Sequence, residues 1–236
     1  MDQKNIKIDT AGTAIKKAVK IDLFIRNLFV KLLIIFIYIL FIISIIGIIA
    51  DFFSILTLSA LEQSLTNLSI SLFLAYFALK LFYRFRLTRP HPKDLKTALS
   101  NIDQDKSENL YALFSLNLAK TWDSFSCLPK NTQTEEALLL EMLKNQDIDF
   151  ILARIGVSKN LIAEYFNSEK TPFEPKTLYR ALKIAISESH HQIETGDLLV
   201  SLTESNPSFK KFLNDSSLSA QDIMNIVYWQ TTVIKN

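Results

Sequence analysis

Two long runs of apolar residues dominate the first third of the chain. Residues 32–50 (LLIIFIYILFIISIIGIIA) are nineteen positions without a charged side chain. As a helix this run spans roughly 28 Å, which is close to the ~30 Å hydrocarbon core of a bilayer. It exceeds the ~7–15 apolar residues of a signal peptide, and no small-residue cleavage site follows it. The pattern therefore predicts a transmembrane helix.

The second run, residues 63–79 (QSLTNLSISLFLAYFAL), also lacks charged side chains. It is less apolar, because Asn67, Ser69 and Ser71 lie near its start. It extends to Tyr83 if the Lys80 side chain reaches the membrane interface. We expect a second span here, with an amphipathic or re-entrant element as the alternative. Together the two runs predict a transmembrane helical hairpin over residues 32–83.

Basic residues flank this hairpin and predict its orientation. Residues 1–31 contain seven Lys and Arg residues, and residues 80–93 contain five. The connecting loop, residues 51–62, contains none. The positive-inside rule then predicts a multi-pass protein of the cell membrane with both termini and the C-terminal domain in the cytoplasm. Residues 1–31 form a basic juxtamembrane segment that meets anionic headgroups, so the lipid bilayer is the first predicted partner.

After the hairpin, the pattern changes to that of a soluble helical domain. Residues 84–107 are predicted to be a linker, because two prolines stop helices and the remainder is polar. Residues 108–232 have apolar positions at helical spacing, and strand-like alternation is nowhere sustained. We expect one helix over residues 109–125 and later helices bounded by three cap residues, Thr134, Gly156 and Ser158.

Two halves of this domain, residues 109–167 and 176–230, are similar to each other. Residues 109–111 align with 177–179, 137–143 (ALLLEML) with 197–203 (DLLVSLT), and 151–162 with 212–223. Chance similarity between amphipathic helices is the alternative, but the order of the segments and their nearly constant spacing favour a repeat. The predicted fold class is therefore all-α: a transmembrane helical hairpin followed by a duplicated (two-repeat) helical bundle.

Composition narrows the possible chemistry. The four glycines lie too far apart for a Walker A loop or a Rossmann fingerprint, and Cys127 is the single cysteine. His190 and His191 are adjacent and make a poor metal pair. From Asp94 onward there are 19 acidic and 14 basic residues, which argues against nucleic acid as a partner. We expect no enzyme activity, no catalytic residue, no metal site and no cofactor.

The run from His190 to Leu199 (HHQIETGDLL) resembles the H-x-x-I-G-T-E-H-L-L signature of the Clp repeat domain, the N-terminal domain of Clp-type AAA+ unfoldases. The matching residues are His190, Ile193, Thr195, Leu198 and Leu199. In the first half, TEEALL (residues 134–139) occupies the same place, with Glu136 at the signature glutamate. The resemblance covers the soluble domain and nothing before residue 100.

The resemblance implies a compact two-repeat bundle that binds adaptors or substrates and passes them to an ATPase ring. In one branch of the family the signature glutamates help to hold phosphoarginine. Here Gly196 stands at that place in the second half, and Ala137 and Asp197 stand at the signature histidine. We therefore expect a membrane-anchored module that recognises protein substrates or adaptors for a Clp-type AAA+ ATPase, in another chain or in a longer form of this one. The alternative is a structural membrane protein that self-associates through its helical domain.

In the family, the loops before the two leucine-rich helices lie close together and ligands bind around them. Here these loops carry polar and acidic residues, namely Thr134, Glu135 and Glu136 in one half and Glu194, Thr195 and Asp197 in the other. Because helix N-termini stabilise carboxylates, we expect these groups to be ionised and to form one face that binds a cationic protein segment. The alternative is that they only cap helices on a solvated surface.

The predicted topology can be tested by cysteine labelling of intact membranes. A membrane-impermeant reagent added from outside should modify single cysteines placed in residues 53–61. It should not modify cysteines in residues 1–25 or 100–236, because the positive-inside rule places these in the cytoplasm. Labelling of the C-terminal domain from outside would contradict the prediction.

Overall fold

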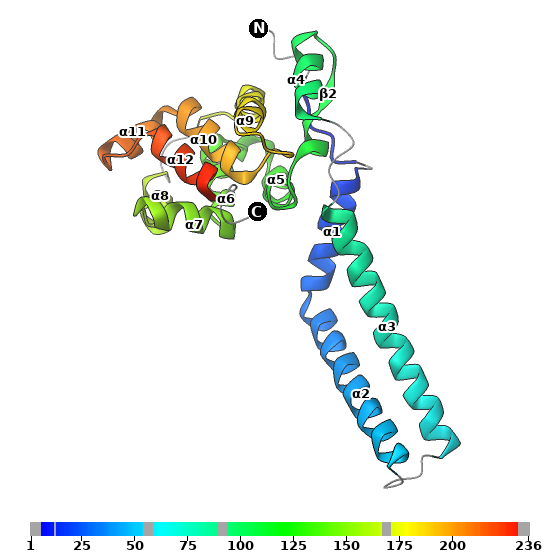
Figure 1. Cartoon of the computed structure of the whole chain (residues 1–236). Helices are drawn as coiled ribbons and strands as arrows, with labels where there is room; N and C mark the ends of the chain where they lie inside the picture. Colours follow the sequence, from blue (N-terminus) through cyan, green and yellow to red (C-terminus); the bar gives the residue numbers. More distant parts are fainter. Residues whose placement is uncertain (1–5, 12, 54–58, 89–93, 167–170, 231–236) are drawn as a thin grey trace. The chain divides into compact units, whose positions relative to one another are not determined.

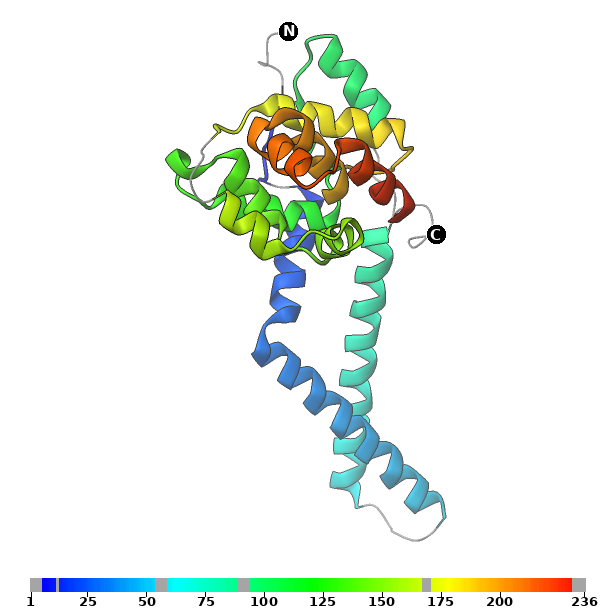
Figure 2. The same cartoon turned by 90° about the vertical axis from the view of Figure 1, so that its left-hand side faces the viewer.

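The computed structural model describes residues 6–11, 13–53, 59–88, 94–166 and 171–230, which are mostly helical (Figures 1 and 2). The chain divides into two compact units. One is Lys20–Arg89, and the other combines Met1–Val19 with Pro90–Asn236. The second unit is therefore assembled from both sides of the first in sequence.

The first unit is built on two long helices, α2 (Leu28–Phe52) and α3 (Ala60–Thr88), which pack side by side as a hairpin (Figure 1). Aromatic rings join them: Phe41 stacks on Phe73 with ring centroids 4.0 Å apart, and Tyr38 meets Phe73 edge-on at 5.3 Å. Val30–Phe52 and Glu62–Leu81 are long and apolar enough to cross a membrane, by length and composition. The predicted hairpin is thus confirmed as a pair of long apolar helices.

Part of the predicted linker is a helix. In α4 (Leu95–Asp103), Leu95 and Ala98 are buried, and Leu99 and Ile102 pack against the same core. These four positions follow the i, i+3, i+4, i+7 spacing of one helix face. The Tyr179 hydroxyl donates a 2.7 Å hydrogen bond to Asp103 and ties α4 to helix α9 (Pro175–Ser187). The two prolines of this segment lie outside the described residues.

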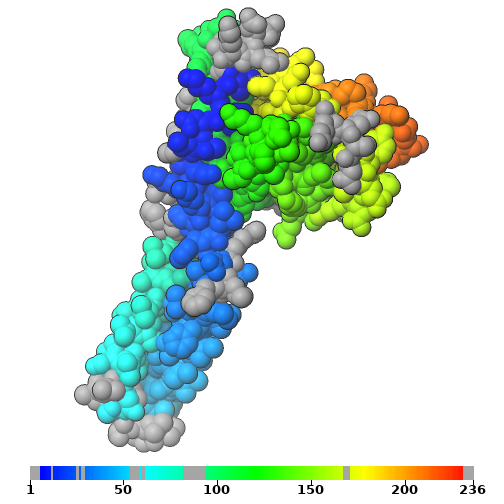
Figure 3. Space-filling view, turned by 180° about the vertical axis from the view of Figure 1, so that it is seen from behind, coloured from blue at the N-terminus to red at the C-terminus, as the bar shows by residue number. Residues whose placement is uncertain are grey.

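The N-terminal segment is part of the domain that follows the hairpin. Strand β1 (Ile6–Lys7) pairs in parallel with β2 (Glu108–Asn109), a small exception to the all-α prediction. The first turns of α1 (Ala14–Arg26) bury Ile15 and Val19 in the domain core. Figure 3 shows the dark-blue N-terminal residues against the green part of the domain. Residues 6–19 thus complete this core, beyond the juxtamembrane role predicted for them.

The remaining helices of the domain come in two sets of four. The first set is α5 (Leu116–Ser126), α6 (Glu135–Met142), α7 (Gln146–Ile155) and α8 (Lys159–Tyr165). The second is α9, α10 (Thr195–Ser205), α11 (Pro207–Asp215) and α12 (Ala220–Trp229). Each helix of the second set begins 59–61 residues after its counterpart. The cap residues correspond too, because asparagines begin α7 and α11 and serines begin α8 and α12.

The predicted helix over residues 109–125 is wrong. Instead, β2 is followed by a 3₁₀ helix, η2 (Leu110–Leu113), and α5 begins only at Leu116 with Ser115 as its N-cap. The break is caused by Ile193, whose N–H donates to Leu113 and whose carbonyl accepts from Ser115 at 2.9 and 3.0 Å. The alignment of residues 109–111 with 177–179 is therefore also wrong, because the first lie before α5 and the second lie inside α9. A second 3₁₀ helix, η3 (Lys130–Thr132), precedes α6.

The centre of the domain is α10, whose residues Thr195–Thr203 are all buried. It packs against α6, α7, α9, α11 and α12. The approach of α12 requires a glycine, because a Cβ atom on Gly196 would lie 2.7 Å from a methyl group of Val227. This contact gives a steric reason why the second half has no glutamate at the signature position. The predicted caps at Thr134 and Ser158 are confirmed, and Gly156 ends α7 with a φ of 73°.

The contribution of the N-terminal segment can be measured in a soluble protein that joins residues 6–19 to residues 94–230 through a flexible linker. Ile15→Ala should lower its free energy of unfolding by about 2–4 kcal/mol, since the side chain is buried in the core. Lys17→Ala, at an exposed position two residues away, should change it by less than about 0.5 kcal/mol. Urea denaturation followed by circular dichroism measures both, and equal effects would contradict the docking of α1.

Candidate functional site

The first group of predicted site residues lies at the start of α6. The Thr134 hydroxyl caps the helix by accepting from the Ala137 N–H at 3.2 Å. Glu135 accepts a 2.6 Å hydrogen bond from the Thr177 hydroxyl, and Glu136 accepts one of 2.8 Å from the Thr171 N–H. These bonds hold both carboxylates against the start of α9 and the residues before it.

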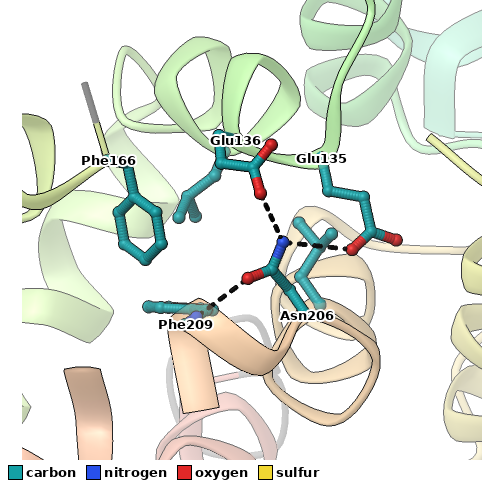
Figure 4. Close-up of a pocket in the computed structure, with 7 residues that line it drawn as sticks. Glu135, Glu136, Phe166, Asn206 and Phe209 are labelled. Atoms are coloured by element: carbon teal, nitrogen blue, oxygen red, sulfur yellow. Dashed lines mark hydrogen bonds between the residues drawn. The ribbon is translucent and has the colours of Figure 1, made fainter. Parts of the chain in front are cut away.

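A single asparagine lies between the two carboxylates (Figure 4). The Asn206 side-chain amide donates to Glu135 at 3.2 Å and to Glu136 at 2.8 Å. Its side-chain oxygen accepts from the Phe209 N–H at 2.8 Å, which caps α11. One side chain therefore uses both its donor and its acceptor groups to join the start of α6 to the start of α11.

Both glutamates are buried, each only 3% exposed. The space between them and the rings of Phe166 and Phe209 is too narrow to hold a water molecule (Figure 4). In this conformation the carboxylates are engaged by groups of the protein itself. Each Glu136 oxygen already accepts a hydrogen bond, one from Thr171 and one from Asn206.

Burial has opposite outcomes for the two carboxyls. It raises the pKa of Glu135 above its ordinary value, and the charge of Glu136 adds to the rise, against hydrogen bonds from Thr177, Asn206 and Ser205. Burial also opposes ionisation of Glu136, but hydrogen bonds from Asn206 and Thr171 outweigh it, so the pKa of Glu136 is lowered. Glu136 is therefore the carboxylate that the site stabilises.

The second group of predicted site residues lies at the start of α10. Glu194 and Asp197 form a capping box, in which the Glu194 N–H donates to Asp197 at 2.8 Å. Thr195 and Asp197 are fully buried and Glu194 is half-buried. The Thr195 hydroxyl accepts a 3.2 Å hydrogen bond from the side chain of Asn145, the N-cap of α7.

Asp197 also pairs with a histidine. His190 Nδ1 lies 3.0 Å from Asp197 Oδ1, and both side chains are buried. Burial alone would lower the pKa of His190, but the hydrogen bond and charge of Asp197, with the charges of Glu194 and Glu188, raise it. His190 follows the end of α9 at Ser187, where its N–H donates to the Ala185 carbonyl at 2.8 Å, and its ring turns to Asp197.

The expected single acidic face is not formed by these residues. The group around Glu135 lies at the C-terminal end of α10, and the group around Asp197 lies at its N-terminal end. The helix has eleven residues, so about 16 Å separate its ends. Asn206 of the second helix set bonds both carboxylates of the first group, whereas in the second group Asn145 bonds Thr195 and the buried Asp197 faces His190. The prediction that these six residues form one exposed surface is wrong, because all of them except the half-buried Glu194 are buried.

A surface cluster on α7 and α12 escaped the sequence analysis. The rings of Phe150 and Trp229 stack with centroids 5.8 Å apart, and the Arg154 guanidinium lies 4.9 Å from the Trp229 ring centre and 5.4 Å from that of Phe150. Tyr228 and Trp229 are 50% and 39% exposed. We call Phe150, Arg154 and Trp229 the aromatic surface cluster. The sequence pattern predicts Tyr228 and Trp229 to be core residues. Only their position at the end of the last helix indicates that they are exposed.

Comparison with known proteins adds no identification: no protein-family model, curated protein or solved structure matches the chain. Among the described residues, no group of three His, Cys, Asp or Glu side chains could hold a metal ion. Cys127 is exposed.

The role of Asn206 can be tested against Asn145, which caps the equivalent helix. Asn206→Ala should cost about 2–4 kcal/mol of stability at pH 7, because it removes a cap and the shared donor of two buried carboxylates. The hydrogen bonds to the ionised Glu136 carboxylate stabilise the folded protein at pH values above the pKa of this group in the unfolded chain. This contribution to stability is lost as the pH falls through the lowered pKa of Glu136 in the folded protein. The cost should therefore shrink between pH 7 and pH 3.

Asn145→Ala is the matched control, because it removes a cap and a bond to the neutral Thr195 hydroxyl. It should cost about 1 kcal/mol, nearly independent of pH. Denaturant unfolding at each pH measures both variants. Parallel pH profiles for the two would show that Asn206 does not act through the carboxylates.

Proposed function

We propose that this chain is a membrane-anchored protein-binding module of the Clp repeat type, which holds protein substrates or adaptors at the cytoplasmic face for a Clp-type unfoldase. The observation that carries the proposal is that each helix set supplies an asparagine side chain to the start of a helix in the other set, α6 or α10. Asn206 of one helix set closes the start of α6, and Asn145 of the other set closes the start of α10. Crosswise contacts of this kind are what a duplicated bundle with pseudo-twofold symmetry predicts.

The sequence signature and the packing support the same proposal. Residues of the Clp-like signature, Ile193, Thr195, Leu198 and Leu199, are all buried around the start of α10. Two isolated backbone bridges, one parallel and one antiparallel, also join the two helix sets. Phe114, just before α5, pairs with Ile193 before α10, and Pro172, just before α9, pairs with Thr134 before α6. These contacts join equivalent parts of the two helix sets crosswise.

The membrane location rests on α2 and α3. In the span Val30–Phe52, large apolar side chains such as Ile35, Ile42 and Ile46 are more than half exposed. Exposure of this kind is unfavourable in water and favourable in hydrocarbon. The basic residues on both sides of the hairpin support an orientation with the domain in the cytoplasm.

For partner binding, the aromatic surface cluster is a better candidate than the buried carboxylates. Trp, Tyr and Arg are the residues most enriched at binding hot spots, because they combine large apolar area with directed hydrogen bonds. The Arg154 guanidinium can donate hydrogen bonds to a carboxylate of the partner while its face stays on the Trp229 ring. The surface therefore suits an acidic segment with apolar side chains, where the sequence alone had favoured a cationic one.

The proposal can be tested by crosslinking the full-length chain in membranes and identifying the captured proteins. We expect a Clp-type ATPase, its adaptor or degradation substrates, and Arg154→Ala with Trp229→Ala should reduce capture at least about tenfold. Lys183→Ala is the matched control, since it removes a similar cation–ring contact on Tyr179 of α9. Capture of this chain alone would favour the structural alternative, and unchanged capture by the double variant would exclude the aromatic surface cluster.

A further inference from the structure

One face of α3 carries small and polar residues although it points away from α2. Ser64, Asn67, Ser71, Ala75 and Ala78 are all exposed in the structure. With roughly 100° of rotation per residue, these five positions fall within about 80° of one another on the helix. The residues that face α2, among them Ser69, Phe73 and Tyr76, lie on the opposite side. Large side chains such as Leu65, Leu68, Leu72 and Leu74 flank the small face. We call the five residues the outer face of α3.

Among the residues on this face, Asn67 has the most unfavourable free energy of transfer into a bilayer. It lies five residues inside the candidate span Glu62–Leu81, so about 7 Å of helix separate it from the span's end. Ser71 satisfies its hydroxyl by donating to the Asn67 backbone carbonyl at 2.8 Å. Within the part of the chain that the structure describes, the side-chain amide of Asn67 has no hydrogen-bond partner. In hydrocarbon, an unpaired amide is strongly unfavourable.

A second copy of the same helix supplies the missing partner. A primary amide is both donor and acceptor, so two Asn67 side chains related by a twofold axis can each donate to the other. The small residues of the outer face allow two helix backbones to approach closely, as membrane helix pairs do. The amide is thus complementary to its own copy, and the leucines on either side can pack around the contact.

We propose that two copies of this chain associate in the membrane through the outer face of α3, with their Asn67 side chains hydrogen-bonded to each other. This inference rests on the proposed membrane location. It assigns self-association to the hairpin and leaves the helical domain of each copy free to bind partners.

The proposal can be tested with the full-length chain, labelled with donor or acceptor dyes and reconstituted into phosphatidylcholine–phosphatidylglycerol vesicles at low protein density. Energy transfer should report dimers, and Asn67→Leu should weaken association about three- to thirtyfold. Asn67→Gln keeps the amide and should retain most of the association. Ser69→Ala is the matched control: it removes a polar group two residues away that faces α2, and it should leave energy transfer unchanged.

Cysteine crosslinking tests the geometry independently. In a Cys127→Ser background, Ser71→Cys should form an intermolecular disulfide on mild oxidation, whereas Leu72→Cys, about 100° around the helix, should not. Equal energy transfer for the parent chain and Asn67→Leu would overturn the proposal, as would crosslinking at Leu72 but not at Ser71. Vesicle flotation separates this result from a failure of the proposed function: a chain that does not float with vesicles has no membrane hairpin, and both proposals then fall.

Discussion

Two carboxylates at the start of a buried helix must find hydrogen-bond donors inside the protein, and the domain is organised around the donor that they share. Asn206 gives its amide protons to Glu135 and Glu136 and uses its oxygen to begin α11. The side chain can do this only if α6, α10 and α11 meet at one point. The packing of the second helix set on the first is therefore fixed by polar geometry as well as by apolar area, since a buried carboxylate without donors is strongly destabilising.

The equivalent contact at the other end of α10 uses neutral groups. Asn145 donates to Thr195, and the charge in that half is carried by Asp197, which faces His190. An asparagine side chain thus bonds the protein together at each end of α10, but the charged groups near the two ends differ. Only the end at Glu135 and Glu136 places two carboxyls on one donor.

Much of the fold could be predicted from the sequence, because the signals were local. The charge-free runs predicted α2 and α3, and Thr134, Ser158 and Gly156 marked helix ends that the structure confirms. The errors arose where distant residues decide. Nothing near Ser115 indicates that Ile193 will break the helix there, and the lysines of the N-terminal segment concealed that Ile15 and Val19 share one buried face. The candidate site failed for a related reason: residues at a helix N-terminus resemble surface caps until the covering residue, here Asn206, is known.

The discontinuity of the domain has a consequence for how the protein is made. Strand β1 and the start of α1 are synthesised before the hairpin, but their partners, β2 and α5, are synthesised only after α2 and α3. About a hundred residues must therefore be translated before Ile6 can pair with Glu108. During that interval Ile15 and Val19 form an apolar face without its core. Completion of the domain thus follows emergence of the hairpin, so that a folded domain marks a chain whose two apolar helices have already left the ribosome.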